Sequence, residues 1–332
     1  MSWAAIVGQN LAVRLMRQAV TTDKVAHAYL FEGPEGVGKR RVALELAKAL
    51  SCHHPGPEGA CDTCSACRRI AADPPVYPDL TILSPDGRFI KTEQVGELQS
   101  VMYARPNEGK VRVAIIDGAD RMNDVAGNRL LKLLEEPPAY AVLILLTHNL
   151  SGVLPTLISR CQVVHFQPLS SEEVARVLVE QSAVQAGEAT LLAALSGGSV
   201  GRAGRMAADE DLKQRREQSG DLLLKLHTLD DLMLIGQAEA LEKEKEHLDD
   251  WLDLFGLWLR DALILAQTGR DELLMNRDRY PVLTGLADRY GAARLMAMLG
   301  IITQARSNLQ KNANTRLALE VMLLRLGEIA QG

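Results

Sequence analysis

The stretch LFEGPEGVGKRRVALELAKAL, from Leu30 to Leu50, decides the fold of the first part of this 332-residue chain. The apolar run 29–31 predicts a buried strand, and a glycine-rich turn leads from it into a helix with an apolar face. In a phosphate-binding loop, backbone N–H groups at a helix N-terminus and a lysine hold phosphate oxygens. That pattern is formed here by Gly33, Gly36, Gly38 and Lys39. We therefore predict a nucleotide-binding fold; the alternative is a glycine turn before an ordinary helix.

Two positions depart from the pattern of an active ATPase. Arg40 follows the lysine, where a Ser or Thr hydroxyl would bind Mg²⁺, and a guanidinium repels a cation. The strand expected at 111–117 ends in Asp117, where such proteins hold Mg²⁺, but the next residue is Gly118 and not the glutamate that orients water. Asp120 lies too far along the turn to replace it. We expect negligible hydrolysis, although the loop and its lysine leave binding of ATP or ADP open.

Hydrophobic periodicity divides the rest of the chain. Five strands are expected at 27–31, 80–83, 111–117, 141–147 and 162–166, interleaved with helices. This alternation predicts a doubly wound α/β domain over residues 1–167. The sequence from Ser170 to Glu173 is a helix-starting cap and opens a small helical module over 168–208. Residues 209–332 are predicted to be helical to the end.

Composition limits the class of protein. The chain is 47% hydrophobic but only 4% aromatic, which favours a helix-rich protein. No run approaches the ~18 consecutive apolar residues of a membrane span, and no secretory signal is evident, so we expect a cytoplasmic protein. The net charge of −5 opposes autonomous binding along a nucleic-acid backbone. Proteins are therefore the expected partners.

Four of the five cysteines fall close together, with the spacing C-x8-C-x2-C-x2-C inside a module at about 51–69. They are Cys52, Cys61, Cys64 and Cys67. Disulfides are disfavoured in the cytoplasm, and four thiolates suit a closed, structural Zn²⁺ site. Redox sensing or burial as small hydrophobic residues are the alternatives. His53 and His54 are possible ligands, but they would break the all-thiolate set. The module is either a rigid insertion, which we favour, or a contact to nucleic acid.

Taken together, the motifs resemble the delta prime family of bacterial DNA polymerase III clamp-loader subunits, within the AAA+ superfamily. The resemblance covers essentially the whole length. It rests on the phosphate-binding loop, the cysteine module and the segments Ile6–Gln9, His27–Gly33, Leu130–Pro138, Ser159–Cys161 and Asn312–Glu320.

The resemblance implies a RecA-like AAA+ domain, a helical lid and a C-terminal collar that joins a hetero-pentamer with delta and three gamma or tau subunits. Such a subunit is a stator that hydrolyses no ATP and helps to load the sliding clamp onto primer–template DNA. It would be part of the DNA polymerase III holoenzyme, a DNA-directed DNA polymerase and nucleotidyltransferase. Arg160, in the Ser-Arg-Cys motif, would be an arginine finger for ATP on the neighbouring gamma or tau subunit.

Two other functions remain open from the sequence. The chain could be an active ATPase of the gamma or tau type, which Arg40 and Gly118 oppose. It could instead be a zinc-dependent nucleic-acid-binding module, which the acidic charge balance opposes. The resemblance also leaves open whether two residues sense a bound nucleotide. Thr147 stands at a strand end, where AAA+ proteins carry a polar residue that faces the nucleotide. Arg202 lies near the position of the lid arginine that senses phosphate in active members, but its spacing is shifted.

Overall fold

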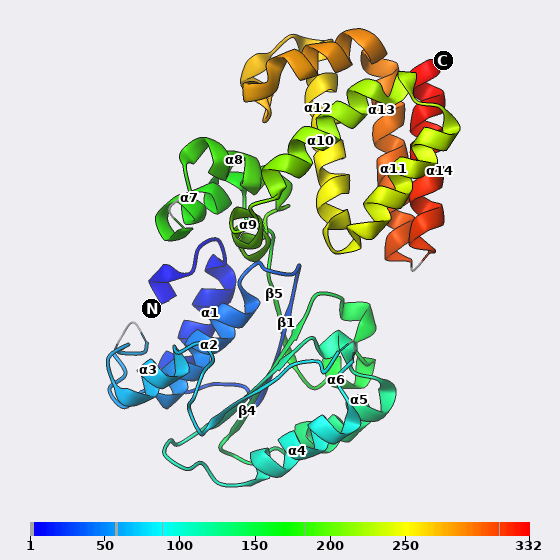
Figure 1. Ribbon diagram of the computed structural model, residues 1–332. Helices are drawn as coiled ribbons and strands as arrows, with labels where there is room; N and C mark the ends of the chain where they lie inside the picture. Colours follow the sequence, from blue (N-terminus) through cyan, green and yellow to red (C-terminus); the bar gives the residue numbers. More distant parts are fainter. Residues whose placement is uncertain (1–2, 57–58, 88, 183, 312) are drawn as a thin grey trace. The chain divides into compact units, whose positions relative to one another are not determined.

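The computed structural model describes residues 3–56, 59–87, 89–182, 184–311 and 313–332 (Figure 1). Residues 57 and 58 of the predicted cysteine module, and Asn312 of the C-terminal motif, lie outside this description. The chain forms two compact units. The first comprises Met1–Ala183 and Ser196–Gly204, and the second comprises Val184–Leu195 and Arg205–Gly332.

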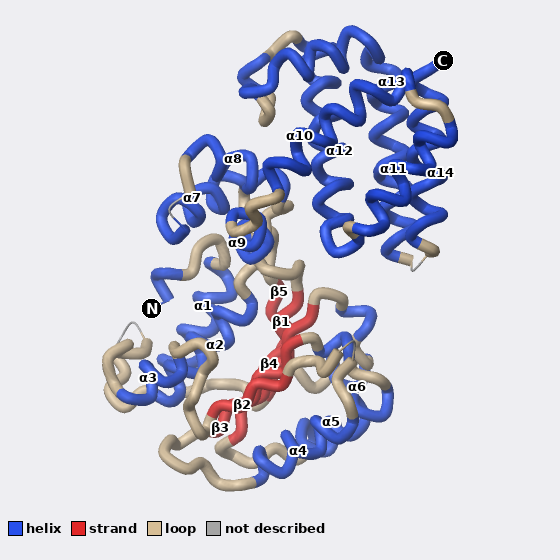
Figure 2. Tube along the Cα trace, viewed as in Figure 1, coloured by secondary structure: helices blue, strands red, loops and turns tan. Residues whose placement is uncertain are grey.

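The first unit is built on one parallel sheet with the strand order β2-β3-β4-β1-β5. Its strands are β1 (Ala28–Glu32), β2 (Leu80–Leu83), β3 (Arg112–Asp117), β4 (Ala141–Thr147) and β5 (Gln162–His165). The five predicted strands are thereby confirmed. Figure 2 draws all of them in this unit, and the described part of the second unit contains no strand.

Helices cover both faces of the sheet, as a parallel sheet requires (Figure 1). One face packs against α4, α5 and α6 around Leu30, Ile116 and Leu143, whereas α1 and α2 lie on the other. The α-helices that lie in this unit are α1 (Asn10–Thr21), α2 (Lys39–Ser51), α3 (Ser65–Ile70), α4 (Thr92–Tyr103), α5 (Asp124–Glu135), α6 (Pro155–Ile158) and α7 (Ser171–Ser182), and α9 (Val200–Ala207) begins here. Short 3-10 helices form at Trp3–Ala5, Ala119–Arg121 and Leu150–Gly152.

Capping side chains fix where two of these helices begin. The Ser170 hydroxyl accepts the Glu173 N–H at 3.2 Å, and the Glu173 carboxylate accepts the Ser170 N–H at 2.9 Å, which confirms the predicted cap of α7. Helix α5 begins at Asp124, because the Asn123 side chain accepts the Ala126 N–H at 2.8 Å.

A buried carboxylate joins the starts of β2 and β3. Asp79 is fully buried, and its oxygens accept the backbone N–H groups of Asn107, Glu108 and Gly109 at 2.6–2.9 Å. The Arg112 guanidinium donates to it at 3.2 Å. Burial opposes ionisation of Asp79, but these donors outweigh burial and hold its pKa below the usual 3.8. The carboxylate therefore fixes the loop that precedes β3.

All regular secondary structure in the described part of the second unit is helical, as predicted for residues 209–332. Its helices are α8 (Ala186–Leu195), α10 (Leu212–Lys225), α11 (Asp231–Lys243), α12 (Leu248–Thr268), α13 (Tyr280–Gln310) and α14 (Thr315–Gln331), and short 3-10 helices lie at Leu226–Thr228, Lys245–His247, Asp271–Leu273 and Arg277–Arg279. Gly291, with a φ of 63°, interrupts α13. Trp258 fills the core, and its indole N–H lies 3.0 Å from the Ser219 hydroxyl. No helix in the described part of the chain combines the length and the apolar character needed to span a bilayer.

Replacing the buried carboxylate tests its structural role. Asp79→Asn should lower the free energy of unfolding by about 3 kcal/mol, because an amide leaves part of a buried charged network unpaired. Because the pKa of Asp79 is lowered in the folded protein, the wild-type advantage is complete above the unfolded pKa of about 3.9 and is lost as the pH falls through the folded value. Urea denaturation followed by circular dichroism between pH 7 and pH 3 measures both effects.

The matched control is Asp86→Asn, in the same unit, because Asp86 pairs with Lys91 at the exposed surface. This substitution should move the unfolding midpoint little. An equal loss of stability in the two variants would refute the role given to Asp79.

Candidate functional site

The predicted phosphate-binding loop has the expected local structure. Strand β1 ends at Glu32, and α2 begins at Lys39, directly after Gly38. Gly36 and Gly38 have φ values of 72° and 108°, which side-chain-bearing residues rarely adopt. A Cβ on Gly36 would stand 2.2 Å from the Ser199 hydroxyl, whereas no atom lies within 4 Å of a Cβ built on Gly38. The backbone is therefore free to approach a ligand at the start of α2.

Lys39 lies within this loop. Its side chain is largely buried, and its ammonium donates to the Pro34 carbonyl at 2.6 Å and to the Gly33 carbonyl. Burial lowers the pKa of Lys39, and the nearby carboxylates, first among them Asp117, offset that effect only in part. The lysine thus supplies a positive charge at the point where the predicted phosphates would sit.

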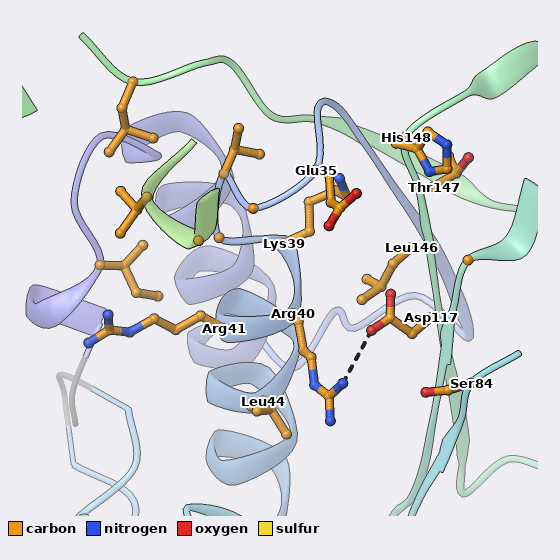
Figure 3. A pocket seen from close by; sticks show the side chains of 18 of the residues that line it. Glu35, Lys39, Arg40, Arg41, Leu44, Ser84, Asp117, Leu146, Thr147 and His148 are labelled. Carbon is orange, nitrogen blue, oxygen red and sulfur yellow. Dashed lines mark hydrogen bonds and ion pairs between the residues drawn. The ribbon is translucent and has the colours of Figure 1, made fainter. Parts of the chain in front are cut away.

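A cavity of about 710 Å³ opens beside the loop, within the first unit. Figure 3 shows side chains from the loop, α2 and the ends of β3 and β4 around it. The apolar lining residues are Ile6, Val7, Val37, Leu44, Pro85, Leu146, Leu169, Val177 and Val200. The charged lining residues are Glu35, Lys39, Arg40, Arg41, Asp117 and Arg121. The cavity therefore combines an apolar lining with mainly positive charge.

An ion pair occupies the position expected for a magnesium ion. The Arg40 Nη1 lies 3.3 Å from the Asp117 Oδ2, and both side chains are partly exposed (Figure 3). Mg²⁺ needs oxygen ligands in octahedral geometry, and a guanidinium offers none. Gly118, after Asp117, carries no carboxylate. The residues present do not fit a magnesium site.

Thr147 is buried at the end of β4 and lines the cavity. Its hydroxyl lies 2.8 Å from the Asp120 Oδ1 and accepts the Asn149 N–H at 3.1 Å. Asp120 also lies 3.3 Å from the His148 Nδ1. Asp120 is thus bonded to two residues that line the cavity, although it is not itself a lining residue. Arg202 does not line the cavity either, although Gly201 does.

Arg160 lies outside this cavity, in the turn between α6 and β5. Its guanidinium donates to the Glu135 carboxylate at 2.7 Å and to the Thr156 carbonyl at 3.0 Å, and its side chain is 37% exposed. Strand β5 runs parallel to β1, so β5 starts on the side of the sheet where the strands begin. Strand β1 ends on the opposite side, where the phosphate-binding loop lies. Arg160 therefore cannot act on a ligand held in the cavity of its own chain.

The four cysteines of the predicted metal site come together. Cys52 follows α2, Cys61 and Cys64 precede α3, and Cys67 is buried within α3. Their sulfur atoms all lie within 4.8 Å of one another. A tetrahedral Zn²⁺ with Zn–S bonds of about 2.3 Å would place its sulfurs ~3.8 Å apart, so this set can hold a zinc ion. His53 and His54 are not in the group.

Hydrogen bonds and burial affect these thiols in opposite directions. Hydrogen bonds from the Thr63 side chain and backbone and from the Cys64 N–H lower the pKa of Cys61 to about 5. Burial raises the pKa of Cys67. Backbone N–H groups also contact sulfur, with the Cys61 N–H donating to the Cys52 Sγ at 3.2 Å. The donors suit thiolates, which are the form that binds a metal.

A buried cation connects this cluster to α2. The Lys48 ammonium lies 2.8 Å from the Glu45 carboxylate and 2.6 Å from the Asp62 carboxylate, and its side chain is only 2% exposed. Asp62 is next to Cys61 in the chain and has a positive φ of 57°. This contact was not predicted, since nothing in the sequence separates Lys48 from an ordinary surface lysine on α2.

Other lining and partner residues also escaped the sequence analysis. Arg121 and His148 line the cavity but belong to no motif, and only their closeness to Asp117 and Thr147 could have indicated them. The contact of Glu135 with Arg160 joins residues 25 positions apart and depends on how α5 packs beside α6.

Comparison with known proteins gives consistent matches along the chain. A family model described as "DNA polymerase III, delta subunit" matches residues 8–170, and one described as "DNA polymerase III, delta subunit, C terminal" matches residues 210–328. The DNA polymerase III subunit delta′ of Bacillus subtilis is 32% identical over 323 residues, covering 96% of each chain. Subunit tau of the same organism is 26% identical over 351 residues, covering 97% of this chain and 60% of that protein.

Among solved structures, the chain is similar to a gamma subunit-related protein of DNA polymerase III from Thermotoga maritima. The TM-score is 0.45 at 18% identity, with 96% of this chain and 99% of that chain covered.

Proposed function

The chain belongs to the delta′ family of DNA polymerase III subunits, and we propose that it is the non-hydrolysing stator of a clamp-loader ring. In this role it presents Arg160 to the ATP site of a neighbouring gamma or tau subunit. The observation that carries the proposal is the Arg40–Asp117 ion pair at 3.3 Å, where a hydrolysing subunit needs its magnesium ligands.

The missing groups account for the lack of turnover. Phosphoryl transfer depends on a metal ion that neutralises developing charge and on a residue that orients the attacking water. Arg40 and Gly118 supply neither. The phosphate-binding loop and Lys39 remain, so the chain keeps a cavity suited to ATP or ADP without the means to split it.

The position of Arg160 supports action on a second subunit. Its guanidinium is partly exposed, and it lies on the opposite side of the sheet from its own cavity. Pairing with Glu135 and the Thr156 carbonyl keeps the side chain in one orientation before a phosphate is available. An arginine supplied in this way stabilises charge on the transferred phosphoryl group by roughly 10³–10⁵ in rate in GTPases.

Surface residues of the second unit support a role in assembly. Leu232 and Met233 on α11 and Leu317 on α14 are 80%, 55% and 59% exposed, so apolar side chains of these two helices are available to a partner. We assign residues 1–167 to the AAA+ domain, 168–208 to the lid and 209–332 to the collar. The partners are the delta and gamma or tau subunits of a cytoplasmic hetero-pentamer, which acts on the sliding clamp and primer–template DNA.

We also propose that the four-cysteine cluster binds one structural Zn²⁺ through Cys52, Cys61, Cys64 and Cys67. The mutual closeness of the four sulfurs and the hydrogen bonds to them support it. All four ligand positions are filled by protein, so the ion would stabilise the module between α2 and α3 and would have no open position for chemistry.

Elemental analysis tests the zinc assignment. The full chain, purified without chelator, should contain about one zinc per molecule. Cys64→Ser should lose most of it, because one of four thiolates is removed. The control is Cys161→Ala, since Cys161 is the cysteine outside the cluster. Metal-free wild-type protein, or equal zinc in both variants, would contradict the proposal.

A reconstituted ring tests the arginine finger. Arg160→Ala should leave assembly intact, because the side chain lies at the surface, yet slow hydrolysis at the neighbouring site by about 10³. In a single-turnover experiment that follows phosphate release, the amplitude of the fast phase should fall by the share that this one ATP site contributes.

Arg129→Ala is the matched control, because Arg129 is an exposed arginine of α5 that contacts Gln99 and not the Arg160 turn. It should release phosphate as the wild type does. An unchanged fast phase in Arg160→Ala would end the finger assignment. Magnesium-dependent ATP turnover by the chain alone would favour the gamma- or tau-like alternative.

A further inference from the structure

We propose that the cavity beside the phosphate-binding loop binds a nucleoside di- or triphosphate without magnesium, with the Arg40 guanidinium taking the place of the cation. This goes beyond the stator role and does not depend on Arg160. It follows from two observations. The phosphate-binding loop with Lys39 is well formed, whereas the Arg40–Asp117 ion pair occupies the position where magnesium would bind.

The cradle is open to a ligand. Gly38 has nothing within 4 Å of its Cβ position, and Lys39 stands beside it with its ammonium on the carbonyls of Gly33 and Pro34. These carbonyl contacts are exchangeable for phosphate oxygens, which are stronger acceptors for an ammonium. The loop thus keeps the groups that hold phosphates whether or not a metal is present.

Charge in the cavity suits a phosphate chain with no metal attached. Four cationic and two anionic side chains line it, and they are Lys39, Arg40, Arg41, Arg121, Glu35 and Asp117. A nucleotide without magnesium carries more negative charge than its magnesium complex and needs more positive charge from the protein. The lining provides this excess, whereas a bound divalent cation would meet repulsion from Arg40.

Arg40 is placed to serve as that charge. It is the second residue of α2, and its side chain is 48% exposed. The contact to Asp117 engages one nitrogen at 3.3 Å, at the long end of the hydrogen-bond range, and a guanidinium carries five N–H donors in a planar fork. The same fork binds phosphate through two parallel hydrogen bonds. Arg40 can therefore hold a phosphate and still neutralise Asp117.

The apolar part of the lining fits the nucleoside. Ile6, Val7, Leu169 and Val177 line the same cavity as the loop, and they offer an apolar surface to a base. A site for inorganic phosphate alone would not need these residues or a volume of about 710 Å³. The structure therefore favours a nucleotide over a free polyphosphate.

Calorimetric titration of the full chain with ATP, ADP and tripolyphosphate tests this, once in EDTA and once in excess MgCl₂. Wild-type protein should bind ATP and ADP in EDTA, and MgCl₂ should not tighten binding. Tripolyphosphate should bind at least tenfold more weakly than ATP. No binding in EDTA, or binding that requires MgCl₂, would overturn the proposal, and equal binding of tripolyphosphate would overturn its nucleoside part.

Arg40→Ser separates the guanidinium from the rest of the site. In EDTA it should bind ATP at least tenfold more weakly than the wild type, because the charge-assisted hydrogen bonds are lost. In MgCl₂ much of that loss should be recovered, since a hydroxyl and a free Asp117 carboxylate then suit the metal. Unchanged affinity in EDTA would refute the role of Arg40.

Two further variants are controls for the loss of one positive charge and for binding at the phosphate-binding loop. Arg129→Ser removes the same charge at the distant α5 surface and should match the wild type in both buffers. Lys39→Ala should abolish binding in both. Circular dichroism of each variant verifies folding. A failure here leaves the phosphate-release result for Arg160 untouched, so the two proposals fall separately.

Discussion

The parallel pairing of β1 with β4 on one side and β5 on the other is the constraint on which the rest of the first unit depends. Because the carboxyl ends of parallel strands lie on the same side of a sheet, the loop after β1, Asp117 at the end of β3 and Thr147 at the end of β4 gather around one cavity. The same pairing sends the turn before β5, and Arg160 with it, to the other side. One topology thus separates the cavity beside the phosphate-binding loop from Arg160, which we propose acts on a neighbouring subunit.

In the proposed function, the Arg40–Asp117 pair accounts for a phosphate-binding loop that does not support ATP turnover. An ion pair between partly exposed side chains contributes little to stability, so it is no structural requirement of the fold. Its effect is on chemistry, because it replaces a metal ligand with a charge of the same sign as the metal. The backbone cradle and the apolar lining do not depend on that position and are preserved.

Sequence patterns predicted much of this structure. Strand β4 is buried at every position and β1 at nearly every position, and such continuous apolar runs can be recognised in a sequence. The phosphate-binding loop and the cysteine spacing could be predicted because their chemistry fixes both the residue types and their separation. Contacts between residues far apart in the sequence could not be predicted. Asp79, which ties two strands together, belongs to no sequence motif, and the partners of Arg160 and Lys48 depend on packing that no local pattern encodes.

Helix α2 has a mechanical consequence. Its first residue is Lys39 in the phosphate-binding loop, its last turn carries Lys48, and Cys52 follows it directly. Thirteen residues at 1.5 Å each make a rod about 20 Å long, and no flexible linker lies between its two ends. A tilt or slide of the helix at the loop is consequently transmitted to the cysteine module, because the two ends of α2 move as one rigid body.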